Sequence, residues 1–506
     1  MNKTRNNIGA NYAGQFWSAI SVFLFVPFYL KFLGIESYGL VGFYITLMGV
    51  LAFADIGLTA TLNREMARLS VHKDSDVELC DLLRTYEFVY ACISFLIILS
   101  VWFMAPLIAN HWLQSEILEP NELTFIIQLM GVAIALQLPA NLYIGGLMGL
   151  QKQVLTNSIQ IGWSMFRGIG SILVLWLISP TILAFIWWQL ISNIIYYLFA
   201  RTAIWRVISS NFVRPRFKWL VFQNTWRYAM GMTGMTFVSI MLLQTDKLVV
   251  SKMLTLEMFG YYMLAVTFAS IPSVLGGPIV RAVFPRLTKL VELGDRDGFV
   301  RLYHRTSELV SVAIIPAALT GILFAGDFIF IWTGSAEASM QAGLVASLLL
   351  AGTLMQSIMV VPFYVALAHG DVKLNLKVGS VSIVLLVPLL LFLIPKYNIL
   401  GAGISWLTMN SIILFPYMYF IHRKFLSGQL LRWCLWSVGR PLLFSLPILL
   451  LGRWLIPHSD SRLLMFFIIG FTWSLAFIVT VISIPNLRHT GINFFYRLFG
   501  APHDGK

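Results

Sequence analysis

The chain has 506 residues, of which 58% are hydrophobic and only 11% are charged. A soluble domain carries roughly 25% charged residues, because its surface must stay hydrated. The composition therefore excludes a soluble enzyme, a secreted disulfide scaffold and a disordered protein, and it indicates a chain that lies in a bilayer. The net charge of +13 comes from short segments between apolar runs. It therefore predicts membrane orientation and no binding of nucleic acid.

Fourteen apolar runs are each long enough to cross a hydrocarbon core of about 30 Å as a helix. They cover residues 11–32, 38–62, 86–108, 123–146, 156–179, 181–200, 229–251, 259–280, 308–332, 341–367, 377–395, 399–420, 434–455 and 463–485. The runs lack the alternation of barrel strands. No small-residue cleavage site follows the first run, so we expect it to be retained. The predicted fold class is an all-α polytopic membrane protein.

The Lys and Arg residues alternate between the gaps that separate these runs. Even-numbered gaps, counted from the N-terminal segment, hold 28 of the 35, and odd-numbered gaps with their helix ends hold five. Because cytoplasmic loops carry the excess of positive charge, we expect both termini to be cytoplasmic. The remaining two, Arg167 and Lys247, lie inside predicted helices.

Cofactor and nucleotide signatures are absent from the sequence. Three cysteines, Cys80, Cys92 and Cys434, show no metal or disulfide spacing. We find no GxxxxGK[ST], HExxH or GxSxG motif. The longest gap, near Arg201–Tyr228, leaves no room for a soluble catalytic domain. The sequence therefore predicts no cofactor, no metal site, no catalytic residue and no hydrolysis of ATP by this chain.

The sequence repeats itself at an offset of 221 residues. Lys31–Gly39 aligns with Lys252–Gly260 and shares Lys, Leu, Glu and Gly, while Arg84–Val89 aligns with Arg305–Val310 and shares Arg, Thr, Glu and Val. Helices one to six therefore repeat as helices seven to twelve. Because six is even, the repeats are parallel, and we expect a central cavity between them. The expected domains are 1–210, 211–431 and an appended helix pair with a cytoplasmic tail, 432–506.

Several segments resemble one family of exporters. They are Phe32–Gly39, Ala54–Leu58, Asn63–Glu65 and Gly146–Gln151. Together with the helix count, these segments resemble the Wzx-type O-antigen flippases of the multidrug/oligosaccharidyl-lipid/polysaccharide exporter superfamily. The resemblance implies translocation of an undecaprenyl-diphosphate-linked oligosaccharide to the outer leaflet of a bacterial inner membrane. It implies this lipid-linked substrate, membrane lipids and other polysaccharide assembly proteins as partners.

Arg167 lies at the centre of the fifth predicted helix. A cation there costs about 2.5–3.5 kcal/mol on insertion scales, so it should face a wet cavity or a partner. A guanidinium matches a phosphate group with two parallel hydrogen bonds, which suits a diphosphate substrate. The competing interpretation is a structural tether to a carboxylate or to a helix C-terminus.

Four further cavity candidates lie in other helices. Asp246 and Lys247 lie in the seventh predicted helix, and Asp55 and Arg64 lie in and at the end of the second. Asp246 and Lys247 need not pair, because neighbours on a helix point about 100° apart. They are candidates for ion coupling and phosphate binding, or for a plain interfacial role. Asp55 is expected to pair with Arg64, to line the inward mouth of the cavity, or to be an N-terminal or interfacial polar residue. Its repeat counterpart lies in Pro272–Pro278, which should break the eighth helix.

Two other functions compete with this interpretation. One is a multidrug or peptidoglycan-precursor exporter of the same superfamily. A cationic cavity favours an anionic lipid-linked substrate over cationic drugs, and it leaves open which glycan or precursor is carried. The other is a membrane glycan polymerase or ligase, which should need a substantial outer loop. The longest such loop, 109–122, is acidic and lacks Lys and Arg. The sequence therefore favours the flippase.

Overall fold

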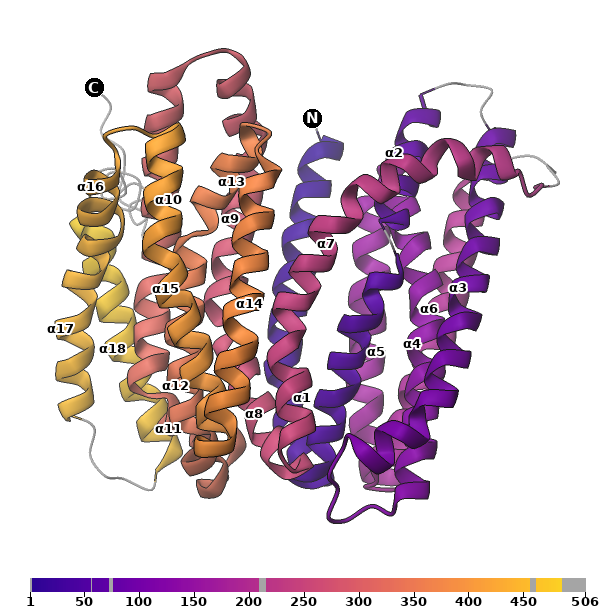
Figure 1. The fold of residues 1–506 in the computed structure, drawn as a ribbon, viewed down its shortest axis with the longest axis horizontal. Helices are drawn as coiled ribbons and strands as arrows, with labels where there is room; N and C mark the ends of the chain where they lie inside the picture. Colours follow the sequence, from indigo (N-terminus) through magenta and orange to yellow (C-terminus); the bar gives the residue numbers. More distant parts are fainter. Residues whose placement is uncertain (1, 56, 72–75, 209–214, 456–460, 485–506) are drawn as a thin grey trace. The chain divides into compact units, whose positions relative to one another are not determined.

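The computed structural model describes residues 2–55, 57–71, 76–208, 215–455 and 461–484 (Figure 1). These residues are almost entirely helical, and they contain no β-strand. Twelve helical segments of the described chain are long and apolar enough to cross a membrane. The all-α membrane architecture predicted from the apolar runs is therefore confirmed.

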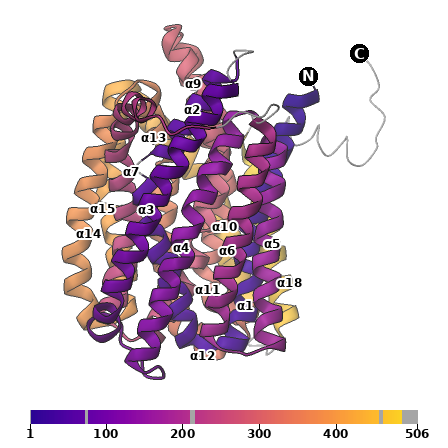
Figure 2. The same ribbon diagram turned by 90° about the vertical axis from the view of Figure 1, so that its right-hand side faces the viewer.

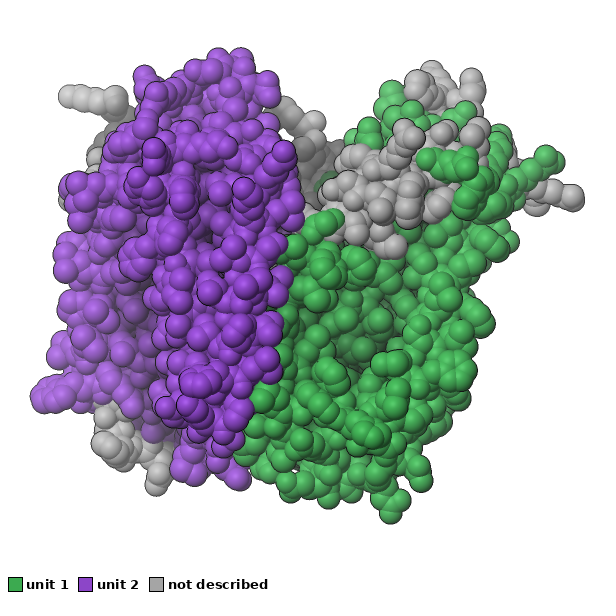
Figure 3. All heavy atoms as spheres, in the orientation of Figure 1, with its two compact units in different colours: residues 1–260 green, residues 261–506 purple. Residues whose placement is uncertain are grey.

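The chain divides by its internal contacts into two compact units, residues 1–260 and 261–506 (Figure 3). Unit 1 contains the first seven helices and the beginning of the eighth. Their bounds are α1 (Asn2–Leu51), η1 (Ala52–Asp55), α2 (Leu58–Leu69), α3 (Asp76–His111), α4 (Pro120–Gly149), α5 (Gln153–Leu177), α6 (Ile182–Ile208), α7 (Trp219–Met253) and α8 (Leu256–Ala269). Within the unit α3 packs against α4, α4 against α6, α6 against α5, and α5 against α1 (Figure 2).

The first predicted span and the first part of the second, residues 38–51, lie in the single helix α1, which is one reason why fewer long helices than apolar runs are found. Gly34 has a φ of 76° and a ψ of 176°, so two helical segments meet there without a loop. A positive φ is accessible to glycine because it has no Cβ. The predicted span 229–251 lies within α7, which is 35 residues long.

Unit 2 contains the remaining helices. Their bounds are α9 (Ile271–Glu292), α10 (Arg296–Leu323), α11 (Ala325–Thr333), α12 (Ala336–Ile358), α13 (Val360–Ala368), α14 (Val372–Tyr397), α15 (Ile399–Phe425), α16 (Leu430–Arg432), the π-helical turn η2 (Trp433–Gly439), α17 (Arg440–Leu455) and α18 (Arg462–Ser483). Here α10 packs against α12, α12 against α15, and α15 against α14, while α17 and α18 pack together and against α10. The final segment 485–506, expected as a cytoplasmic tail, lies outside the described residues.

Three packing contacts recur between the repeats: α3–α4, α4–α6 and α6–α5 in unit 1 correspond to α10–α12, α12–α15 and α15–α14 in unit 2. In unit 1 the second span is interrupted by η1 and Gly57, which has a φ of 69°. The corresponding helix in unit 2 ends at Ala269, and α9 starts at Ile271. The break predicted within Pro272–Pro278 therefore lies just before it. Proline is tolerated in the first turn of a helix, where its missing N–H needs no partner, so α9 begins there and continues.

The equivalent glycines of the two repeats lie in the same contact within unit 1. A Cβ on Gly39 would lie 2.3 Å from the carbonyl oxygen of Leu256, and a Cβ on Gly260 would lie 2.3 Å from that of Ile35. Both pairs, 35 with 256 and 39 with 260, are separated by the repeat offset of 221. Any larger residue at either glycine would force these helices apart.

Candidate functional site: a cationic cluster in unit 1

Arg167 lies in α5, where two glycines let neighbouring helices approach closely. A Cβ on Gly168 would lie 2.1 Å from the ring of Phe25 in α1, and a Cβ on Gly170 would lie 2.1 Å from the indole of Trp188 in α6. The Trp188 indole N–H donates to the backbone oxygen of Arg167 at 3.1 Å. The sequence Arg167–Gly170 thus holds the arginine between α1 and α6.

The partners of the half-buried Arg167 side chain are aromatic. Its guanidinium carbon lies 4.6 Å from the ring centroid of Trp163, which stacks on Tyr196 at 4.2 Å. The charge interacts electrostatically with the hydroxyls of Tyr29, Tyr44 and Tyr196. No carboxylate of the described residues lies within 4.0 Å of the guanidinium, so no carboxylate tether is present there.

Polar and aromatic side chains of α1, α5 and α6 neighbour this cation. The Asn193 amide donates to the Ala133 oxygen at 2.8 Å and to the Tyr44 hydroxyl at 3.4 Å. Two buried polar atoms of this group, Trp163 Nε1 and Asn193 Oδ1, have no hydrogen-bond partner among the described residues. Since a buried polar atom without a partner costs free energy, these atoms favour a polar ligand or water at this place. We call Tyr29, Tyr44, Trp163, Arg167, Asn193 and Tyr196 the Arg167 cluster.

Asp246 and Lys247 in α7 form an ion pair. The Lys247 ammonium lies 3.1 Å from Asp246 Oδ1, and it also donates to the Leu243 carbonyl of its own helix. Asp246 is only 4% exposed. The sequence left open whether these neighbours pair. They do so because the flexible lysine stem reaches back over the helix surface.

Asp55 is the last residue of η1, whereas Arg64 lies in the middle of α2. Asp55 Oδ1 accepts hydrogen bonds from the Thr59 backbone N–H and hydroxyl and from the Tyr90 hydroxyl. A carboxylate at the start of α2 also complements the positive end of the helix dipole. Arg64 lies on the exposed face of α2. These contacts favour the structural interpretation of Asp55.

A second group of charges, centred on Glu87 in α3, is larger than the sequence indicated. Arg84 and Glu87 are three residues apart, so they share a helix face, and they form an ion pair at 3.0 Å. Glu87 Oε1 also accepts from Arg201 at 3.1 Å, Tyr143 at 2.9 Å and Trp205 at 2.9 Å. These partners lie in α4 and α6, far along the chain, and no local spacing could have revealed them.

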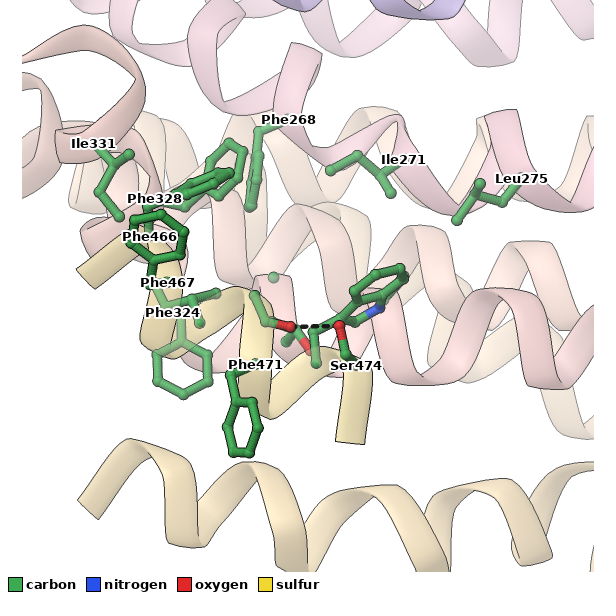
Figure 4. Close-up of a pocket in the computed structure, with 16 residues that line it drawn as sticks. Phe268, Ile271, Leu275, Phe324, Phe328, Ile331, Phe466, Phe467, Phe471 and Ser474 are labelled. Atoms are coloured by element: carbon green, nitrogen blue, oxygen red, sulfur yellow. Dashed lines mark hydrogen bonds between the residues drawn. The ribbon is translucent and has the colours of Figure 1, made fainter. Parts of the chain in front are cut away.

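Unit 2 contains an apolar groove of about 650 Å³ between α18 and the helices α9, α10 and α11 (Figure 4). Its walls are mostly aromatic, including Phe324, Phe328, Phe467 and Phe471. The hydroxyl of Ser474 donates to the Gly470 oxygen of its own helix, so it offers little polarity to a ligand. The groove therefore suits a hydrocarbon chain.

In the described part of the chain, no group of three His, Cys, Asp or Glu side chains could hold a metal ion.

Comparison with known proteins assigns the chain to a family. The family model described as "Polysaccharide biosynthesis protein" matches residues 4–291, more than half of the chain. The chain belongs to the polysaccharide biosynthesis protein family.

Two relatives of this family member are described as a transporter and as a membrane protein. It is 25% identical over 402 residues to the "Putative O-antigen transporter" of Shigella flexneri, covering 77% of this chain and 92% of that protein. It is also 24% identical over 393 residues to the "Uncharacterized membrane protein EpsK" of Bacillus subtilis, covering 73% and 74%.

Solved transporters share the fold of this polysaccharide biosynthesis protein. The lipid II flippase MurJ, in an inward closed conformation, matches with a TM-score of 0.72 and 16% identity over 97% of this chain and 99% of MurJ. An inward-facing multidrug resistance transporter of the MATE family matches with a TM-score of 0.68 and 13% identity over 80% and 94%. The chain has the fold of these transporters, and the second of them is described as a member of the multidrug/oligosaccharidyl-lipid/polysaccharide exporter (MOP) superfamily, as the sequence resemblance implied.

Proposed function

We propose that this protein moves an undecaprenyl-diphosphate-linked oligosaccharide, an O-antigen or similar repeat unit, between the leaflets of the bacterial inner membrane by alternating access. The observation that carries the proposal is the Arg167 guanidinium, which is half-buried in α5 with aromatic neighbours and no carboxylate of the described chain within 4.0 Å. Family membership and the transporter relative support the same function.

In this mechanism Arg167 binds the diphosphate. A guanidinium donates two parallel hydrogen bonds to phosphate oxygens, and these bonds strengthen inside a protein. Sugar hydroxyls would satisfy the buried atoms Trp163 Nε1 and Asn193 Oδ1, which lack partners among the described residues. Each repeat then reorients so that the Arg167 cluster opens first to the cytoplasm and afterwards to the periplasm.

The apolar groove beside α18 is the proposed site of a lipid hydrocarbon chain within unit 2. Its aromatic walls would exclude water from a hydrocarbon. A Cβ on Gly470 would meet no atom within 4 Å, so a larger residue there would enter the groove without disturbing the helix packing.

Energy for transport comes, in this proposal, from an ion gradient or from substrate supply. The chain has no nucleotide-binding motif, and its gaps are too short for a nucleotide-binding domain. Purified protein alone should therefore flip substrate without ATP. Transport that begins only when ATP is added to such liposomes would overturn this part of the proposal.

The proposed orientation places both termini in the cytoplasm. Reporter fusions at Glu116, Ser179 and Glu337 should score as periplasmic, and fusions at Lys73, which lies outside the described residues, Lys218 and Arg296 should score as cytoplasmic. Two or more reversed reporters would contradict the orientation.

The deciding experiment reconstitutes the protein in liposomes and measures which of three lipid-soluble substrates it moves. The substrates are an undecaprenyl-diphosphate oligosaccharide, a peptidoglycan precursor and a cationic drug. Preference for the oligosaccharide, with the glycan length unchanged, supports the proposal. Preference for the drug or the precursor would assign the protein to the rival exporters, and a lengthened glycan would indicate a polymerase.

A further inference from the structure

Unit 1 contains a charged cavity, which is separate from the Arg167 cluster. It has a volume of about 520 Å³ and lies between α3, α4 and α6, beside Phe217. Arg84, Glu87 and Arg201 line it where α3 begins and α6 ends. The other lining residues are Phe88, Ala91, Ser94 and Ile98 of α3, Ala135, Leu136, Pro139 and Tyr143 of α4, and Tyr197 of α6.

The charged end of the cavity can accept one further anion. Arg84 and Arg201 each bind Glu87, at 3.0 and 3.1 Å, and each uses a single nitrogen to do so. Glu87 also accepts from Tyr143 and Trp205, so its oxygens are well supplied with donors. The two guanidiniums are 50% and 39% exposed and have further N–H groups to donate. Two cations and one carboxylate leave a net charge of +1.

The rest of the cavity is apolar and has the length of a lipid chain. From Arg84 to Ile98 the helix α3 rises by about 21 Å, since each residue adds about 1.5 Å. One leaflet of the hydrocarbon core is about 15 Å thick. Phe95 of α3 and Phe199 of α6 are 63% and 65% exposed, so these helices carry a lipid-facing surface. An ammonium, a free sugar or a soluble nucleotide would gain nothing from this apolar surface.

We propose that this cavity binds an anionic glycerophospholipid. Its phosphodiester contacts Arg84 and Arg201, and one acyl chain lies along α3 toward Ile98. A phosphodiester carries a single negative charge, which the net charge of +1 balances. A diphosphate would bring more negative charge beside Glu87 than the two arginines can balance. The inference does not rest on the proposed transport function.

Native mass spectrometry of the purified full-length protein tests the inference. The probes are phosphatidylglycerol and phosphatidylethanolamine with identical acyl chains, and glycerol 3-phosphate as a headgroup without chains. Arg201→Gln removes one contact, and Arg206→Gln, at an exposed position in the same helix, is its control. Ala91→Trp fills the cavity from an exposed position, and Leu96→Trp places the same bulk on an exposed position of α3 outside the cavity.

The expected result is selective retention of phosphatidylglycerol by the wild type and by both controls. Arg201→Gln should weaken that retention about fivefold, as expected for one basic residue near an anionic lipid. Ala91→Trp should weaken retention of the lipid, and glycerol 3-phosphate should not compete. Glu87→Gln should act in the opposite direction, because it frees both guanidiniums. Equal retention of the two lipids, equal effects of Arg201→Gln and Arg206→Gln, or competition by glycerol 3-phosphate would overturn the inference.

Discussion

Replacing Arg167 with glutamine should abolish most transport while leaving the protein folded. The side chain makes one cation–π contact, worth roughly 0.5–2 kcal/mol. Against this loss, removing a cation from the middle of a membrane helix relieves about 2.5–3.5 kcal/mol of insertion cost. The balance favours the variant by about 0.5–3 kcal/mol, so we expect Arg167→Gln to insert at wild-type abundance or above.

The effect on transport should be much larger than the effect on folding. A hydrogen bond from a charged donor is worth about 1.5–3 kcal/mol, which corresponds to about a 10- to 150-fold loss of substrate affinity. Arg167→Lys should retain part of the activity, because an ammonium keeps the charge but cannot form two parallel hydrogen bonds. The assay is export of the lipid-linked oligosaccharide in liposomes, normalised to the amount of inserted protein.

The matched control is Arg206→Gln, which removes an exposed arginine at the end of α6. It should leave normalised export unchanged. Full normalised export by Arg167→Gln would remove this residue from the substrate path. A loss of abundance in Arg167→Gln, restored by a second change elsewhere, would show that Arg167 has a structural role.

Three other predictions concern the ion pair in α7, the groove beside α18 and one helix cap. Lys247→Gln should lower protein abundance, since removing one member of a buried ion pair costs about 3–5 kcal/mol. The double change Asp246→Asn/Lys247→Gln should restore abundance if the pair is structural. Gly470→Leu should reduce export at normal abundance, whereas Gly452→Leu, whose Cβ would lie 2.4 Å from Thr472, should reduce abundance itself; equal abundance of the two variants would contradict the packing argument. A hydrogen bond from Lys424 lowers the pKa of the Asp371 carboxyl below its ordinary value of 3.8. The Asp371 carboxylate therefore stabilises the folded protein above that pH, and this stabilisation is lost as the pH falls through the lowered pKa. Thermal unfolding of the wild type and Asp371→Asn should therefore differ most above about pH 5 and converge in acid, and a difference independent of pH would refute the role of this charge.

The sequence by itself determined the membrane class, most helix positions and the repeat, because each depends on local composition or on direct comparison of segments. An apolar run of about 20 residues must form a helix in a bilayer, since every backbone N–H and C=O needs a partner there. The Arg84–Glu87 pair was predictable for a similar reason, because residues three apart share a helix face. Arg167 was identifiable as a central charge from its position alone.

Tertiary structure decided how these residues are used. Glu87 gains Tyr143, Arg201 and Trp205 as partners only because α4 and α6 pack beside α3. Asp55 binds Tyr90, 35 residues away, so packing of α2 on α3 sets its role.

The constant repeat offset of 221 residues showed that Gly39 and Gly260 correspond, but it did not show why both are glycine. The structure supplies the reason: each glycine lies against the backbone carbonyl of a residue from the other repeat, Leu256 or Ile35, at a distance that leaves no room for a Cβ. A contact between backbones depends on the angle and distance at which two helices cross. These cannot be predicted from the sequence of either helix alone, because they depend on the side chains of both.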